Sequence, residues 1–140
     1  ASDVYKRQHE NVVLRTAPLD HPDASNGYRL EYGGRTFALV SDTEGFPGKC
    51  DKDLLSLTDH ADLAVYDATY TEDEIVSRIG WGHSTWLRGI RLAEKANVKH
   101  LCLFHHDPSH DDDFMDTLAA EANDARPGTV TAREGQIIDL

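Results

Sequence analysis

The chain has 140 residues, and its 14 lysines and arginines against 25 aspartates and glutamates give a formal net charge of −11 with histidine neutral. This length fits one domain, and a hydrophobic fraction of 39% is enough to form a core, which excludes wholesale disorder. The acidity argues against a general grip on a nucleic-acid backbone, and no apolar run approaches the ~20 residues of a membrane span. Two cysteines do not make a disulfide framework, so we expect a reducing, cytoplasmic setting.

The first eight residues, 1–8, are set apart from the expected domain. They have no clear hydrophobic period, and the stretch from Asp3 to Gln8 resembles the translated end of a sequencing-transposon adaptor. The alternative is an ordinary disordered N-terminus, which would also carry no function. We therefore predict one domain over residues 9–140, with the native sequence starting near His9 and an N-terminal part missing.

The remaining chain reads as a hairpin followed by strands that alternate with helices. In chain order, the predicted elements are strands at 11–16, 27–32 and 35–40, a helix at 51–60, a strand at 63–67, helices at 71–78 and 85–96, a strand at 99–104, a helix at 111–125 and a closing pair of strands at 129–132 and 136–139. Gly33-Gly34 is typical of a hairpin turn. Ser84 is expected to cap the helix that starts at Thr85. This order predicts an α/β fold.

Polar side chains that can bind metal follow the ends of the predicted strands. They are His21 before the hairpin, Asp42 after its second strand, Asp67 at the end of the next strand, His83 before a helix, and His105 after the last buried strand. Sites in open α/β sheets collect along such edges. Imidazole and carboxylate ligands together suit Zn, Mn or Fe, so the pattern indicates a metal site.

Each of these residues also has a structural alternative. His21 beside a proline is typical of a surface loop, and Asp42 at a strand end is typical of a turn. Asp67 can cap the turn that follows it, and His83 can simply precede a helix. His105 is the clearest ligand candidate, because a buried strand runs straight into it.

Three segments carry a resemblance to a known family. They are His21-Pro22 followed by Gly27-Tyr28-Arg29-Leu30-Glu31, then Ser41-Asp42-Thr43, and finally Gly82-His83-Ser84-Thr85 with a helix leading to Leu103-Phe104-His105-His106-Asp107-Pro108. In this order, they resemble the C-terminal half of a metallo-β-lactamase-fold hydrolase, closest to the branch of RNase Z and the phosphonate-pathway cyclic phosphodiesterases. The implied fold is half of an αββα sandwich.

The resemblance implies a role for each candidate residue. His21 would bind one metal ion, His105 the other, and Asp42 would bridge both, so that two divalent cations share a hydroxide nucleophile. Zinc is the first expectation, with manganese or iron as alternatives. His83 would lie over the scissile phosphate as a general acid or oxyanion stabiliser. Asp67 stands where RNase Z has a glutamate and would orient a ligand histidine.

The family's main ligand motif, His-x-His-x-Asp-His, is absent from the chain. Three remaining ligands cannot fill two metal sites, and half of a sandwich would expose an apolar sheet face. We therefore expect the full-length protein to be a metal-dependent phosphodiesterase. This chain alone would be inactive, bind metal weakly and tend to aggregate.

The expected substrate is a small phosphodiester, such as a cyclic nucleotide or a cyclic phosphate sugar. No long arm for tRNA lies between His21 and Asp42, and the acidity also disfavours tRNA. Two alternatives remain open. One is a lactonase or thioesterase-type hydrolase on the same fold, and the other is a non-catalytic binding domain with an acidic partner surface. The oligomeric state is left open.

Overall fold

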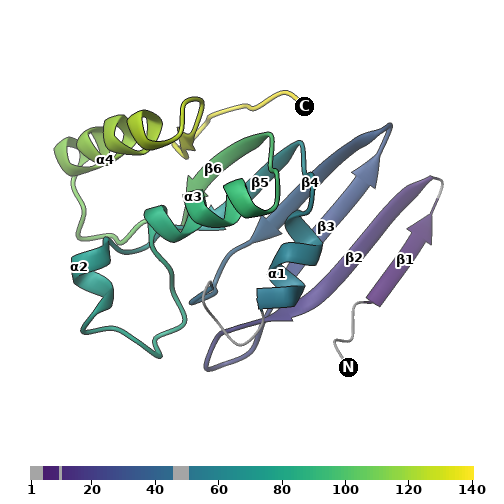
Figure 1. The fold of residues 1–140 in the computed structure, drawn as a ribbon, viewed down its shortest axis with the longest axis horizontal. Coiled ribbons are helices and arrows are strands. Elements are labelled where there is room, and N and C mark those ends of the chain that lie inside the picture. The colour runs from purple at the N-terminus through teal and green to yellow at the C-terminus, as the bar shows by residue number, and fades with distance from the viewer. Residues whose placement is uncertain (1–4, 10, 46–50) are drawn as a thin grey trace.

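Seven strands form one sheet in sequence order, from β1 to β7, in the computed structural model of the chain, which describes residues 5–9, 11–45 and 51–140 (Figure 1). Neighbouring strands from β1 to β4 are antiparallel, and those from β4 to β7 are parallel. The elements are β1 (Tyr5–His9), β2 (Val12–Leu19), β3 (Ser25–Tyr32), β4 (Arg35–Val40), α1 (Asp51–Thr58), β5 (Leu63–Asp67), α2 (Glu72–Ile75), α3 (Trp86–Lys95), β6 (His100–Phe104), α4 (Asp112–Ala125) and β7 (Val130–Thr131).

Strand β1 pairs with β2, from Tyr5 opposite Thr16 to His9 opposite Val12. Residues 5–8 thus belong to a strand, while residues 1–4 lie outside the described part of the chain. An adaptor origin for this segment stays a prediction, because strand pairing does not report where a sequence comes from.

Strand β2 is longer than predicted, because Ala17 and Leu19 alternate into the core and pair with β3. The predicted end of this strand at residue 16 is wrong. Proline was the misleading signal, since Pro18 lacks an N–H. The pairing with β1 stops at Thr16, so β2 has a free edge at Pro18 among the described residues, and an edge strand tolerates proline.

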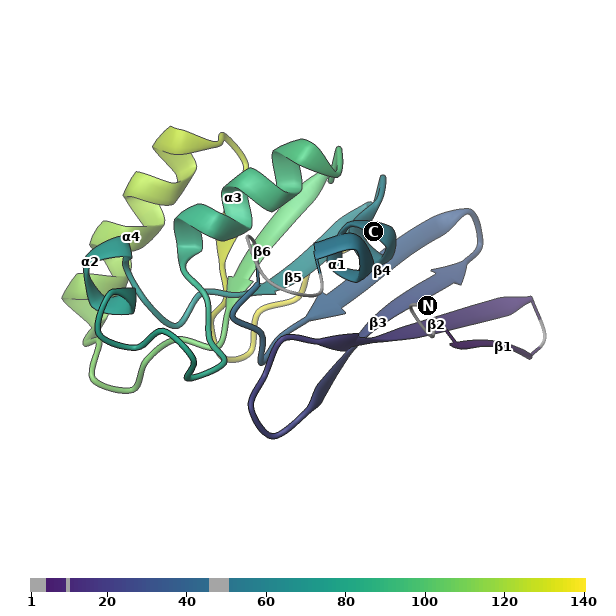
Figure 2. The same cartoon turned by 60° about the horizontal axis from the view of Figure 1, so that its bottom comes forward.

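Helices α1, α3 and α4 lie on one side of the sheet (Figure 2). The core sits beneath them and is built from the inward residues of the central strands, such as Val40, Tyr66 and Leu103, packed with Leu54 and Leu57 of α1. Burial of these large side chains supplies the main stabilising free energy, at ~25 cal/mol per Å² of apolar surface. The same packing fixes which strand residues point away from the helices, because side chains alternate along a strand.

The opposite face of the sheet is apolar and largely uncovered. Tyr28, Leu30 and Tyr32 on β3 are 41%, 37% and 63% exposed, and they alternate with residues that face α1. Leu140 lines a small apolar pocket with Leu30 and Phe37 on this face. The prediction that this chain exposes an apolar sheet face is confirmed.

Several predicted boundaries differ from the structure for local reasons. Helix α2 ends at Ile75 rather than residue 78, because the side chains of Ser77 and Arg78 both donate to the carbonyl oxygen of Glu74 and compete with helix extension. The predicted strand at 136–139 is not formed. A turn at 133–136 takes its place, and only Val130–Thr131 joins the sheet, beside β6.

The cap of α3 is Thr85, which accepts from the N–H of Arg88, and the prediction of Ser84 is wrong. The Ser84 hydroxyl instead lies 2.8 Å from the hydroxyl of Tyr66 in the core. Cys102 is buried, whereas Cys50 lies outside the described residues. Within the described ranges, no helix has the length and apolar character to cross a membrane.

Candidate functional site

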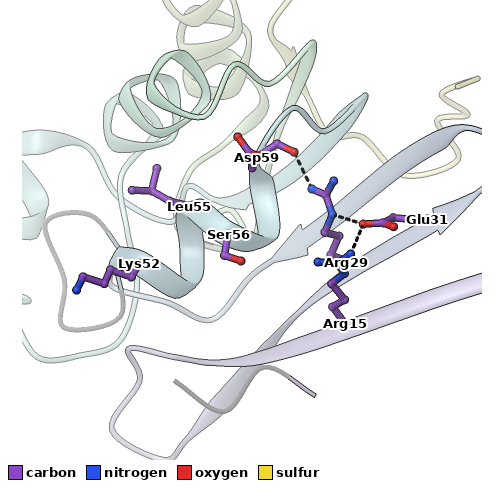
Figure 3. Close-up of a pocket in the computed structure, with 7 residues that line it drawn as sticks. All are labelled: Arg15, Arg29, Glu31, Lys52, Leu55, Ser56 and Asp59. Carbon is purple, nitrogen blue, oxygen red and sulfur yellow. Dashed lines mark hydrogen bonds and ion pairs between the residues drawn. The ribbon is translucent and has the colours of Figure 1, made fainter. Parts of the chain in front are cut away.

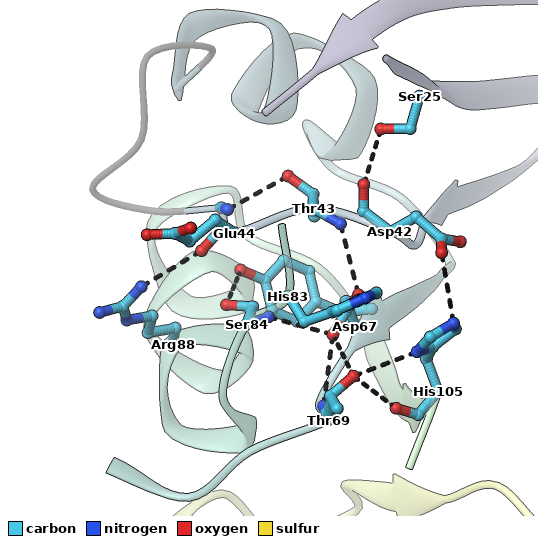
Figure 4. A network of polar contacts seen from close by, with 12 residues as sticks. Ser25, Asp42, Thr43, Glu44, Asp67, Thr69, His83, Ser84, Arg88 and His105 are labelled. Atoms are coloured by element: carbon cyan, nitrogen blue, oxygen red, sulfur yellow. Dashed lines mark hydrogen bonds and ion pairs between the residues drawn. The ribbon is translucent and has the colours of Figure 1, made fainter. Parts of the chain in front are cut away.

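The carboxyl ends of the parallel strands bring the predicted site residues together. Asp42 follows β4, Asp67 ends β5, and His105 follows β6, and these three strands are direct neighbours. His83 comes from the loop before α3, and His21 comes from the turn between β2 and β3. Figure 4 shows four of these side chains, Asp42, Asp67, His83 and His105, around one polar centre.

The distances place metal-binding atoms within reach of one another. His105 Nε2 lies 3.3 Å from Asp42 Oδ1. The donor atoms of His21, Asp42 and His83 lie within 4.8 Å of one another, and so do those of Asp67, His83 and His105. The His83 and His105 rings stack at 4.7 Å, and the His21 ring is 5.5 Å from that of His83. The structure therefore brings all five predicted residues together, while their chemical roles stay predictions.

Asp42 and His105 both adopt the left-handed backbone conformation, with φ of 57° and 60°. This conformation costs a non-glycine residue ~1–3 kcal/mol and persists only where neighbours hold it, often at functional sites. The hydroxyl of Ser25 lies 2.6 Å from the carbonyl oxygen of Asp42, and the hydroxyl of Thr69 lies 2.6 Å from the carbonyl oxygen of His105. Side chains from other strands and loops thus fix the backbone that aims both groups.

Asp67 is fully buried and is the most highly bonded group of the site (Figure 4). Its carboxylate accepts from the backbone N–H groups of Thr43 (3.3 Å), Thr69 (3.3 Å) and Ser84 (3.1 Å). It also lies 2.9 Å from His83 Nδ1 and 2.9 Å from the Thr69 hydroxyl. The carboxylate therefore contacts His83 directly and also caps its own turn, while a role beside a metal-binding histidine stays a prediction.

His105 is joined to the same carboxylate through one hydroxyl. Thr69 Oγ1 lies 2.9 Å from Asp67 Oδ1 and 3.1 Å from His105 Nδ1. A proton on Nδ1 would leave the lone pair of Nε2 on the side of Asp42. That tautomer is the one a metal ligand at Nε2 needs.

The surroundings of His83 favour its protonated form. The hydrogen bond that His83 Nδ1 donates to Asp67 raises the pKa of His83, burial opposes this, and the charges of Asp67 and Asp42 raise the pKa further. A protonated imidazole is a donor at both nitrogens. Nδ1 is used by Asp67, so Nε2 is the position from which His83 can donate to another group.

Gly82 allows the His83 loop to approach His21. Its φ is +89°, and a Cβ there would lie 2.3 Å from His21 Cδ2 and 2.6 Å from Pro22 Cδ. Both the backbone conformation and the close contact therefore require glycine.

Thr69 and Ser25 are site residues that sequence reasoning missed. Only Thr69 carried a usable signal, because a hydroxyl two residues after a buried aspartate often bonds back to it. The position of Ser25 beside Asp42 depends on a contact between residues 17 positions apart in sequence.

Two neighbouring histidines have other environments. Burial lowers the pKa of His106. His110 is 6% exposed, lies 2.8 Å from Glu74 Oε1 and stacks on Phe114. His110 therefore joins the α2 end of the molecule to α4, and neither residue is among the grouped metal-binding side chains of the described residues.

A separate pocket of about 520 Å³ lies beside α1 (Figure 3). Arg29 crosses it, donating to Glu31 and to the carbonyl oxygens of Leu57 (3.0 Å) and Asp59 (2.8 Å). Its main role there is to tie the end of α1 to the sheet, because those carbonyl groups have no partner within the helix.

Comparison with known proteins identifies the family. Residues 7–106 match the family described as "Beta-lactamase superfamily domain". The chain belongs to this family. Two curated ribonuclease Z proteins are similar: that of Brevibacillus brevis is 38% identical over 71% of this chain and 31% of its own length, and that of Halalkalibacterium halodurans is 32% identical over 96% and 41%. The chain thus spans less than half of these relatives.

Solved structures show that the fold is about half of a metallo-β-lactamase fold. The metallo-β-lactamase fold protein YhfI from Bacillus subtilis aligns with a TM-score of 0.77 at 20% identity, covering 96% of this chain and 52% of its own. The short form of human tRNase Z aligns with a TM-score of 0.74 at 20% identity, covering 95% and 45%. A diphosphatase from the PhnP family aligns at 0.66 and 20%, covering 96% and 46%. The predicted family and fold class are confirmed.

Proposed function

We propose that the chain carries one half of the active site of a metal-dependent phosphodiesterase. The observation that supports this most directly is the convergence of His21, Asp42 and His105, with two of them held in a left-handed backbone conformation. The ribonuclease Z relatives and the structural likeness to a diphosphatase of the PhnP family favour phosphate ester chemistry. The beta-lactamase superfamily match covers the segment that contains all five site residues.

The donor set fits divalent metal ions. Imidazole nitrogens and a carboxylate suit zinc first, with manganese or iron as alternatives. His21 would hold one ion, His105 the other, and Asp42, which lies within reach of both histidines, would bridge them. When bound, such ions polarise phosphoryl oxygens and lower the pKa of water. These three side chains do not complete two coordination spheres, so we propose that a His-x-His-x-Asp-His segment in a longer chain supplies the rest.

His83 and Asp67 would handle charge and protons at the phosphate. Asp67 holds Nδ1 of His83 and favours the protonated ring. Nε2 of His83 can then stabilise a developing negative charge or donate a proton to the leaving oxygen. The buried backbone N–H groups around Asp67 keep its carboxylate in place while His83 acts.

The preferred substrate would be a small phosphodiester rather than tRNA. The segment between His21 and Asp42 is occupied by a short turn and the β3–β4 hairpin, with no added arm. The net charge of −11 also opposes binding of a large polyanion. The similarity to ribonuclease Z proteins is the observation that favours tRNA as the substrate, so pre-tRNA belongs in the same assay.

The test compares this chain with the complete gene product, using bis-(p-nitrophenyl) phosphate, cyclic nucleotides, pre-tRNA, a lactone and a thioester. We expect phosphodiester hydrolysis by the complete product and none by this chain alone. A complete, metal-loaded product without phosphodiesterase activity would refute the proposal. Lactone or thioester turnover would favour that alternative, and absence of metal would favour a non-catalytic binding domain.

Replacing one ligand gives a separate test. His105→Ala in the complete product should remove one metal equivalent in elemental analysis. His60→Ala is the matched control, because His60 is exposed and contacts Asp59 outside the cluster. Equal metal content in the two variants would contradict the assignment of His105.

A further inference from the structure

The segment between α2 and α3 exposes three large apolar side chains within six residues. Val76, Ile79 and Trp81 are 71%, 68% and 60% exposed. Keeping such surface in water loses the free energy that burial would give, and grouped exposed apolar residues commonly mark a binding site. The segment ends at Gly82, directly before His83 of the polar cluster.

This exposed segment is fixed in position by hydrogen bonds. The N–H of Arg78 donates to Ile75 (2.9 Å) and that of Trp81 donates to the carbonyl oxygen of Arg78 (3.1 Å). The N–H of Gly80 donates to a carboxylate oxygen of Glu44 (2.6 Å). The indole is therefore presented by an ordered turn, so a ligand that stacks on it meets a surface already in place.

Flat side chains connect Trp81 with the polar cluster. The guanidinium of Arg78 lies 6.0 Å from the ring centre of Trp81 and 5.0 Å from that of Tyr70. The Tyr70 ring is in turn 6.2 Å from that of His83. The Arg78 guanidinium therefore supports one side of the indole and brings a positive charge beside it, which attracts a negatively charged ligand.

We propose that Trp81 and Arg78 form a stacking platform for a nucleobase, so that the site selects nucleotides over phosphate sugars. A nucleotide would place its base on the indole of Trp81 and its phosphate toward His83 and the other metal-binding side chains of the site. The proposal rests on the phosphodiesterase function proposed above. It adds that the substrate carries an aromatic base, because the His and Asp side chains of the proposed metal site do not by themselves distinguish a nucleotide from a phosphate sugar.

The test measures binding of AMP, adenosine and ribose phosphate to this chain by equilibrium dialysis. We expect AMP to bind about tenfold or more tightly than ribose phosphate, the size of one base-stacking contact. Trp81→Ala should abolish this difference. Tyr32→Ala is the matched control, because Tyr32 is 63% exposed on the sheet face and should leave the difference unchanged.

Tryptophan fluorescence gives an independent measurement. The chain has two tryptophans, so Trp86→Phe leaves Trp81 as the only reporter, and adenosine should quench it. Equal affinity for AMP and ribose phosphate, or a base preference that survives Trp81→Ala, would overturn the proposal. Adenosine has no phosphate, so its binding tests the platform even if the phosphodiesterase proposal fails.

Discussion

Replacing Asp67 by alanine should destabilise the chain strongly, independently of any metal. The carboxylate is fully buried and accepts from three backbone N–H groups, those of Thr43, Thr69 and Ser84. Each buried donor left without a partner costs ~1–3 kcal/mol. Water entering the vacated space recovers part of this, so the expected loss in free energy of unfolding is ~3–5 kcal/mol, as for other broken buried charge contacts.

Urea unfolding followed by circular dichroism measures this loss. Asp67→Asn should cost less, because the amide keeps one acceptor oxygen. Asp59→Ala is the matched control, since the Asp59 side chain is 64% exposed and pairs with the exposed His60, and it should cost less than ~0.5 kcal/mol. A loss below ~1 kcal/mol for Asp67→Ala would refute the view that this carboxylate organises the loops of the site.

Two further substitutions test the geometry and the electrostatics. Gly82→Ala should lower stability and weaken metal binding, because its methyl group would lie 2.3 Å from a ring carbon of His21; zinc titration that matches the unmodified chain would contradict this. Asp62→Asn should destabilise the chain at neutral pH and cost less in acid, below the ordinary pKa of an aspartate. A hydrogen bond from the Thr36 N–H lowers the pKa of Asp62 in the folded chain. The charged carboxylate therefore stabilises the fold above the pKa of the unfolded chain, and this stabilisation is lost as the pH falls through the folded pKa. An equal loss of stability at neutral and acid pH in urea unfolding would contradict this.

The strand ends of the site could be predicted because apolar runs lead directly into polar residues. Leu101-Cys102-Leu103-Phe104 before His105 is one such run, and β6 indeed ends at Phe104. The boundaries that failed depend on contacts between distant residues. Serine is a common helix cap, but the Ser84 hydroxyl hydrogen-bonds to the buried hydroxyl of Tyr66. Thr85 caps α3 instead.

The positions of the site residues were predictable, but their connections were not. Asp67 was expected to orient a metal-binding histidine, whereas its direct partner is His83, and only the hydroxyl of Thr69 joins it to His105. A sequence gives residue types at strand ends, and the choice between two histidines a few ångströms apart is made by loop conformations. Those conformations depend on positive φ values, which sequence periodicity does not report.

The left-handed conformations explain how part of the proposed metal site can be organised within this chain. Asp42 and His105 would both relax toward ordinary backbone geometry if nothing opposed it, since each conformation costs ~1–3 kcal/mol. The hydroxyls of Ser25 and Thr69 bind the backbone carbonyl oxygens of Asp42 and His105, respectively, and a metal ion at the side chains does not need those oxygens. The side chains therefore stay free to bind while the backbone is fixed. A partner segment that brings the remaining ligands would meet donors already aimed, so little of its binding free energy would be lost in ordering them.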